Sequence, residues 1–158
     1  MKLATIVLFF SLPLSAQSAH YRHHGTVPLN DLAATPGAVD AADTKAVLCS
    51  PKFRTGTVRN VPESLKHAVC AAYGVSPANC TGKKVEIDHL ISLEIGGSND
   101  QKNLWPQPYA PQPGAKEKDV LEDTLHRLVC AGKLALEDAQ SCIAKDWVAC
   151  SGRIQGIE

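Results

Sequence analysis

Asp88 and His89, adjacent at the end of an apolar, strand-like run, are the residues of this chain best suited to chemistry. Gly96 and Gly97 then provide a turn, and Asn103 follows it. A carboxylate is a preferred ligand of a hard divalent cation, and an imidazole with an ordinary pKa of about 6.5 can take a proton from an attacking water. An asparagine amide can satisfy loop backbone groups and so keep the histidine in register. The sequence therefore predicts a metal-assisted hydrolytic site, with Asp88 as a metal ligand, His89 as the catalytic base and Asn103 as its catalytic partner.

These three residues also have ordinary structural interpretations. Asp88 could cap a turn, His89 could be a partly buried core histidine, and Asn103 could be a turn asparagine. An isolated Asp-His pair favours those structural roles. The pair followed by the two glycines and by Asn103 at this spacing favours an active site instead.

The elements that must position these residues are short. Residues 84–90 alternate in the manner of a strand, and a second extended piece is expected around Leu104. Helices are expected over residues 62–74, 115–132 and 136–147, where apolar residues recur at helical spacing. The predicted fold class is α+β, a small hairpin flanked by helices and stapled by disulfides.

The N-terminal residues have the features of a signal peptide. Lys2 precedes an apolar run over residues 3–14, and Ala16 and Ser18 give the small-residue pattern at which signal peptidases cut. The run is short for a membrane span, which needs about 20 residues, although an uncleaved anchor is the alternative. We therefore predict a signal peptide over residues 1–19 and no membrane span in the mature form.

The rest of the chain is interpreted as one small domain with two flanking segments. Residues 20–46 are rich in Ala, Pro, Thr and Gly without a period, and they predict a flexible leader. Residues 47–150 are expected to form the catalytic domain, and residues 151–158 a C-terminal tail.

Six cysteines follow the predicted signal peptide, and an even count in an exported chain predicts three disulfides. The short separations favour Cys70–Cys80 and Cys142–Cys150, which leaves Cys49–Cys130. A zinc-thiolate site is the alternative, but no Cys-x-x-Cys spacing is present. The expected location is outside the cytoplasm, either secreted or periplasmic.

The charge balance limits the kind of nucleic-acid binding that is possible. The chain has 16 basic and 16 acidic residues and a formal net charge of zero. A protein that coats nucleic acid non-specifically would be strongly basic, whereas an enzyme needs only a local basic cleft. Arg59, in a segment that leads into a predicted helix, and Lys118 are the predicted phosphate contacts.

The segment over residues 88–108, with its Asp-His pair, Gly-Gly turn and Asn-Leu-Trp-Pro run, resembles the HNH endonucleases of the ββα-metal superfamily. Together with residues 48–51, 58–64 and 118–147 it resembles a group of small exported bacterial HNH-like proteins. The resemblance implies a ββα-metal core formed by the hairpin and a helix. It also implies a metal-dependent endonuclease that hydrolyses phosphodiester bonds of nucleic acid, with DNA favoured over RNA. The implied cofactor is a divalent ion, Mg²⁺ before Mn²⁺ or Zn²⁺, and no protein partner is evident.

HNH proteins usually carry a His or Asn ligand early on the helix after the hairpin, and this chain has neither there. Three residues on one face of this helix remain as candidates for the metal ligand. Asp119 is the first choice and Glu122 the second, and His126 is a further ligand or a phosphate contact. A solvated helix face with i, i+4 pairs such as Lys118 with Glu122 is the alternative.

Two other functions remain open from the sequence. One is a non-catalytic exported binding module on an HNH-like scaffold, and the other is a cystine-rich inhibitor without a metal, which predicts a buried His89. An enzyme requires Asp88, His89 and either a helix carboxylate or His126 to converge on one cleft.

Overall fold

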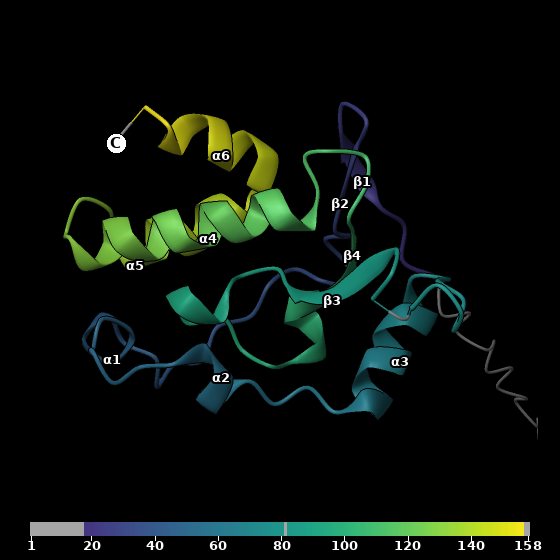
Figure 1. The fold of residues 1–158 in the computed structure, drawn as a ribbon, viewed down its shortest axis with the longest axis horizontal. Helices are drawn as coiled ribbons and strands as arrows, with labels where there is room; N and C mark the ends of the chain where they lie inside the picture. The colour runs from purple at the N-terminus through teal and green to yellow at the C-terminus, as the bar shows by residue number, and fades with distance from the viewer. Residues whose placement is uncertain (1–17, 81, 157–158) are drawn as a thin grey trace, which may run out of the picture.

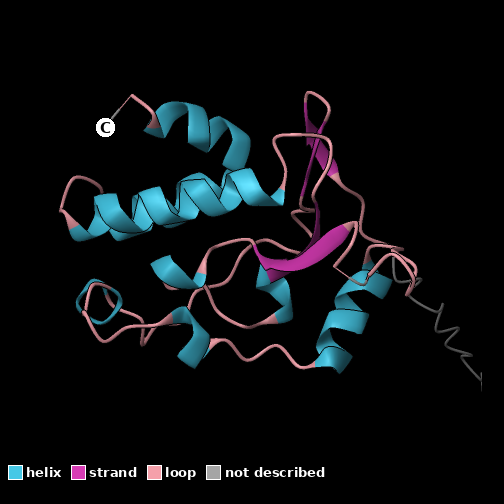
Figure 2. Cartoon of the chain, in the orientation of Figure 1, coloured by secondary structure: helices cyan, strands magenta, loops and turns pink. Residues whose placement is uncertain are grey.

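The computed structural model describes residues 18–80 and 82–156 and has the predicted α+β class. Among these residues there are two separate two-stranded antiparallel sheets, and helices surround the second of them (Figures 1 and 2). The predicted signal peptide, residues 1–19, falls almost entirely outside the described residues. No helix in the described part of the chain is long and apolar enough to cross a membrane.

The predicted hairpin is confirmed. Strand β3 (Val85–His89) pairs with strand β4 (Leu104–Pro108), and the register sets Asp88 opposite Trp105 and His89 opposite Leu104. Each strand has a single partner, so β4 tolerates its prolines because an edge strand need not donate every N–H to a ladder.

The connection between the two strands depends on its glycines. It contains two short 3₁₀ helices, η1 (Leu93–Ile95) and η2 (Gln101–Asn103). Gly96 has a φ of 80°, a left-handed conformation that favours glycine. A Cβ at Gly97 would overlap the carbonyl of Ile91. The Gly-Gly turn therefore brings the connection back across the strand that carries the Asp-His pair.

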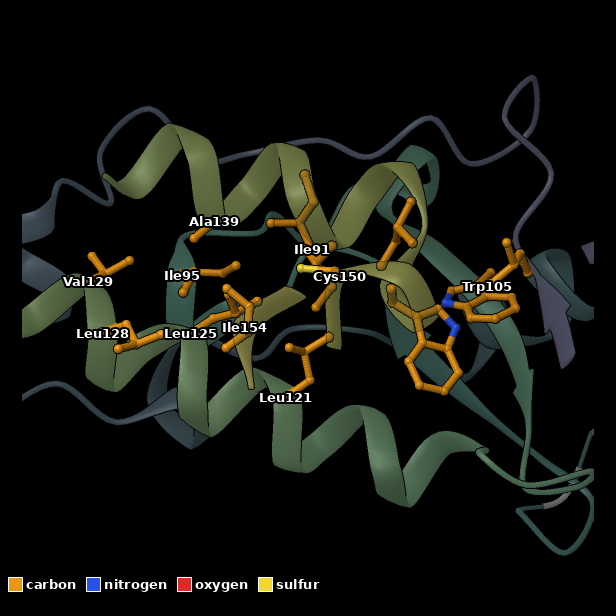
Figure 3. Packing of buried hydrophobic residues seen from close by; sticks show 14 of the residues in the cluster. Ile91, Ile95, Trp105, Leu121, Leu125, Leu128, Val129, Ala139, Cys150 and Ile154 are labelled. Atoms are coloured by element: carbon orange, nitrogen blue, oxygen red, sulfur yellow. The ribbon is translucent and has the colours of Figure 1, made fainter. Parts of the chain in front are cut away.

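Helix α4 (Ala115–Cys130) forms the third part of the hairpin-plus-helix unit and packs against η1 and β3. Its other side contacts α5 (Leu136–Lys145) and α6 (Trp147–Ile154), so that it lies in the middle of the molecule (Figure 1). The remaining helices are α1 (Lys45–Leu48), α2 (Thr55–Val58) and α3 (Glu63–Ala72). The buried side chains around α4 include Trp105, Leu125, Ile95 and Ala139 (Figure 3).

The interpretation of residues 20–46 as a flexible leader is wrong. Strands β1 (Arg22–His24) and β2 (Val27–Leu29) form a hairpin, and Val27 and Leu29 belong to the core. The buried Thr35 hydroxyl donates to the carbonyl of Leu104 at 3.0 Å, which joins this segment to β4. Strands of three residues are too short to produce a detectable period, so this packing has no signal in the sequence.

The predicted C-terminal tail, residues 151–158, is also wrong over most of its described length. Helix α6 continues to Ile154, which is buried in the core. The helix predicted over residues 136–147 is interrupted at Asp146, whose side chain accepts from the Ala149 N–H at 2.9 Å and caps α6.

All three predicted disulfides are confirmed, and they are Cys49–Cys130, Cys70–Cys80 and Cys142–Cys150. The first joins α1 to α4 over a separation of 81 residues, and the other two close local loops. Disulfides of this kind fit an oxidising compartment.

Candidate active site

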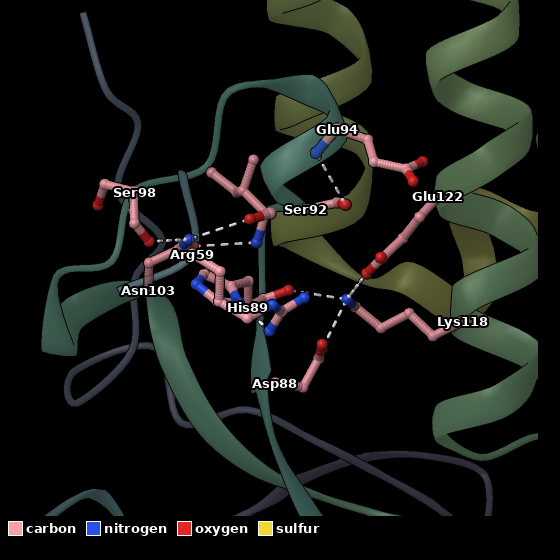
Figure 4. A network of polar contacts seen from close by, with 10 residues as sticks. Arg59, Asp88, His89, Ser92, Glu94, Ser98, Asn103, Lys118 and Glu122 are labelled. Carbon is pink, nitrogen blue, oxygen red and sulfur yellow. Dashed lines mark hydrogen bonds and ion pairs between the residues drawn. The ribbon is translucent and has the colours of Figure 1, made fainter. Parts of the chain in front are cut away.

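The carboxylate of Asp88 binds a buried ammonium group. Lys118 reaches from α4 to strand β3, and its Nζ donates to Asp88 Oδ2 at 2.7 Å and to the His89 carbonyl at 2.9 Å (Figure 4). The third acceptor is the Glu122 carboxylate, one turn further along α4. An ammonium has three N–H donors, and all three are used here. The Lys118 side chain is 1% exposed, so it offers nothing to a ligand in solution.

The neighbouring carboxylates determine the protonation state of Lys118. Burial lowers the pKa of Lys118, but the Asp88 and Glu122 carboxylates outweigh it and hold the pKa above its ordinary value. Burial raises the pKa of Glu122 to about 7, because the Lys118 ammonium offsets desolvation only in part and Asp88 adds repulsion. Lys118 is therefore a permanent cation at neutral pH.

The ring of His89 lies in a different environment, formed by amide groups. Its Nε2 is 3.1 Å from Asn99 Oδ1. The orientation of the Asn99 amide is fixed, because its Nδ2 donates to the Val58 carbonyl at 2.9 Å and its Oδ1 accepts from the Asn60 N–H at 3.0 Å. An oxygen can only accept, so Nε2 of His89 must carry the proton. The lone pair of neutral His89 is therefore on Nδ1.

That Nδ1 faces Arg59, whose Nη1 is 3.4 Å away. Arg59 is exposed, and it also lines a cavity of about 440 Å³ along residues 85–87 of β3. Lys66 in the same lining is paired with Glu63 at 2.6 Å, so Arg59 is the basic group that faces His89. The predicted phosphate contact and the predicted base are thus neighbours. The other predicted phosphate contact, Lys118, is enclosed in the ion network.

Burial lowers the pKa of His89, and the Asn99 hydrogen bond and the Asp88 charge oppose that shift. The imidazole is consequently neutral at pH 7. A neutral ring with a defined tautomer can accept a proton, which is the state a general base requires.

Asn103 makes the backbone contacts that the sequence predicts for it. Its Nδ2 donates to the carbonyls of Ile91 and Ser98, both at 2.9 Å, and its Oδ1 accepts from the Ile91 N–H at 2.9 Å. The side chain is fully buried, so it fixes the connection behind His89 and does not face a ligand. A catalytic role for Asn103 stays a prediction. Any such role would be indirect, because Asn103 contacts the loop backbone and not a ligand.

The four predicted metal ligands do not form one shell. Asp88 and Glu122 come together, but their oxygens surround the Lys118 ammonium. Asp119 is exposed on α4, and His126 Nε2 lies 3.2 Å from the Leu48 carbonyl near α1. The residues present do not fit a divalent cation at the predicted place, because a cationic side chain already occupies the space between the carboxylates.

A different group of ligand-type atoms lies where the end of α1 meets the end of α4. Cys49, His126 and Cys130 each offer an atom within 4.8 Å of the others, so this group could hold a metal ion. The two cysteines form a disulfide here, and thiolate is the form of cysteine that binds metals.

Asn99, which contacts the His89 ring, is not among the site residues predicted from the sequence. It stands two residues after Gly97, in a loop whose path decides which of several polar side chains reaches His89. Comparison of the chain with protein-family models, with curated proteins and with solved structures gave no match.

Proposed function

We propose that this protein is an exported endonuclease that hydrolyses phosphodiester bonds of nucleic acid, with DNA favoured over RNA and His89 as the general base. The observation that carries the proposal is the defined tautomer of His89. Asn99 holds the proton on Nε2, and the lone pair on Nδ1 faces an exposed guanidinium.

In the proposed reaction, Arg59 binds the scissile phosphate through its planar N–H groups and stabilises the charge that develops there. The phosphate draws the guanidinium away from Nδ1, which opens that nitrogen to a water molecule. The water oxygen forms a bond to phosphorus while its proton moves to Nδ1 of His89. The bond to the leaving oxygen breaks, and that oxygen takes a proton from solvent.

Asp88 assists by its charge. When Nδ1 accepts the proton, His89 becomes an imidazolium, and the neighbouring carboxylate favours that cation. Lys118 holds the Asp88 carboxylate in place at 2.7 Å. The hairpin therefore supplies a base and the counter-charge for its protonated form from two adjacent residues.

No step is assigned to a metal, because Asp88 and Glu122 are engaged with Lys118. The cleavage assay nevertheless includes Mg²⁺, Mn²⁺ and Zn²⁺ as candidate cofactors. The group of Cys49, His126 and Cys130 would offer thiolates only after reduction of its disulfide. Three disulfides and the predicted signal peptide support a secreted or periplasmic location.

The second candidate function is a non-catalytic exported binding module. The cystine-rich inhibitor without a metal is one form of such a module. One observation favours it: His89 is 2% exposed. A ring that stays covered by Arg59 cannot reach water. In that case Arg59 and the cavity beside it would bind an anionic partner without cleaving it.

The test is cleavage of supercoiled plasmid and of RNA by the oxidised protein, in EDTA and with each of the three metals. His89→Gln removes the base, and His67→Gln, at an exposed position on α3, is the matched control. Cleavage by the wild type and by His67→Gln, with at least a hundred-fold loss in His89→Gln, supports the proposal. A folded protein that binds nucleic acid without cleaving it under any condition supports the binding module.

A further inference from the structure

We propose that Lys118 is a built-in cation, whose ammonium takes the place between Asp88 and Glu122 that a divalent metal would occupy. The site would then act without a metal ion. The part of this inference that concerns cleavage rests on the proposed function, whereas the part that concerns cation binding does not.

Three oxygens meet at Nζ of Lys118. They come from the Asp88 carboxylate, the His89 carbonyl and the Glu122 carboxylate. Carboxylate and backbone carbonyl oxygens are the ligands that hard divalent cations prefer. Strand β3 and helix α4 thus present a set of oxygens suited to a cation. The cation that they bind is the protein's own Lys118 ammonium.

Lys118 fits this place closely. Each of its three donors has an acceptor, and the side chain is 1% exposed. A second cation entering the same space would face the repulsion of a buried ammonium and would have to take its acceptors. A divalent metal and the Lys118 ammonium therefore exclude each other from this set of oxygens.

A specific consequence follows for a variant that lacks the ammonium. Lys118→Ala leaves two carboxylates and a carbonyl around an enclosed space, with no positive charge between them. Such a set attracts a divalent ion, so the substitution is expected to create a metal site where the wild type has none.

The experiment is titration of the metal-free protein with Mn²⁺, following the loss of the free-ion signal by electron paramagnetic resonance, together with thermal unfolding with and without Mn²⁺. Lys116→Ala, at an exposed position two residues earlier on α4, is the matched control. The wild type and Lys116→Ala are expected to bind no equivalent of Mn²⁺ and to keep the same Tm. Lys118→Ala is expected to bind one equivalent and to gain stability from it, and Lys118→Ala/Glu122→Gln is expected to lose that binding.

Two results would overturn the inference. One is a wild type that binds one equivalent of Mn²⁺ and loses it in Asp88→Asn. The other is a folded Lys118→Ala that binds none. If Lys118→Ala does not fold, the wild-type titration decides alone.

Cleavage assays separate this inference from the proposed function. Equal cleavage by the wild type in EDTA and in Mg²⁺ supports the built-in cation, and cleavage that needs added metal contradicts it. Absence of cleavage in every condition contradicts the proposed function, and the Mn²⁺ titration still decides the role of Lys118.

Discussion

The two faces of strand β3 hold their polar side chains by different means. Asp88 points towards α4 and is held by the buried ammonium of Lys118. His89, the next residue, is held on the other side by the amide of Asn99 and lies beside the exposed Arg59. Successive side chains of a strand point to opposite faces, so one step along the chain separates the Lys118 ion network from a neutral imidazole held between an amide and a guanidinium.

This difference assigns different roles to the two sides. The Lys118 ammonium stays protonated at neutral pH and has no free donor, so its network stabilises the fold and sets a fixed charge. His89 is neutral, has one nitrogen that can accept a proton, and lies beside a group that can bind phosphate. In the proposed reaction the chemistry belongs to the face with His89, and the face with Lys118 supports it.

The largest effect is expected from Lys118→Met, which tests whether the ion network stabilises the fold. The substitution leaves the carboxylates of Asp88 and Glu122, whose side chains are 12% and 14% exposed, without their cation. Breaking one side of a buried ion pair costs about 3–5 kcal/mol. Chemical denaturation is expected to show a loss of that size in the free energy of unfolding. Lys116→Met, at the exposed control position, should change it by no more than about 0.5 kcal/mol. Equal stabilities for the two variants would mean that the ion network contributes nothing.

Asn103→Ala tests the loop that joins the two strands. It removes the amide that satisfies the backbone groups of Ile91 and Ser98, and each unsatisfied buried group costs about 1–3 kcal/mol. We expect a loss of about 3 kcal/mol by chemical denaturation, against little change for the exposed Gln101→Ala. A loss as small as that of the control would contradict the role of Asn103 in fixing the loop.

The hairpin and its turn were predictable from sequence because alternation, paired glycines and the Asp-His pair are local signals. The disulfide pairing was predictable because two short separations leave one remaining pair. The packing of residues 20–46 was not predictable, because it depends on isolated contacts such as that of Thr35 with β4. The buried position of Lys118 was not predictable either, because a lysine on a helix is ordinarily exposed and only the hairpin places acceptors around it.

Asn99→Ala tests whether the hydrogen bond to His89 matters for cleavage. It removes the acceptor that keeps the proton on Nε2, and loss of an outer hydrogen-bond partner of this kind costs about 10- to 100-fold in activity. We expect the cleavage rate to fall by that factor while Asn60→Ala, whose backbone N–H contact remains, keeps its rate. Unchanged cleavage in Asn99→Ala would show that the tautomer does not matter.

The smallest expected effect is the pH dependence of stability. The pKa of folded His89 lies below its ordinary 6.5, so the unfolded chain binds this proton first as pH falls. The stability associated with neutral His89 is complete above about pH 6.5 and is lost as pH falls through the folded pKa. The free energy of unfolding of the wild type, relative to that of His89→Gln, should therefore decrease between pH 7.5 and pH 5. A relative increase over that interval would contradict the burial of a neutral ring.

The central claim is that His89 has its proton on Nε2 and its lone pair on Nδ1. The most direct measurement is a long-range proton–nitrogen correlation spectrum of the histidine rings at pH 7, with His89 assigned by comparison with His89→Gln. We expect a neutral ring with a protonated Nε2 and an unprotonated Nδ1, and a change in the Nδ1 shift in Arg59→Ala. A ring protonated on Nδ1, or one charged at pH 7, would contradict it.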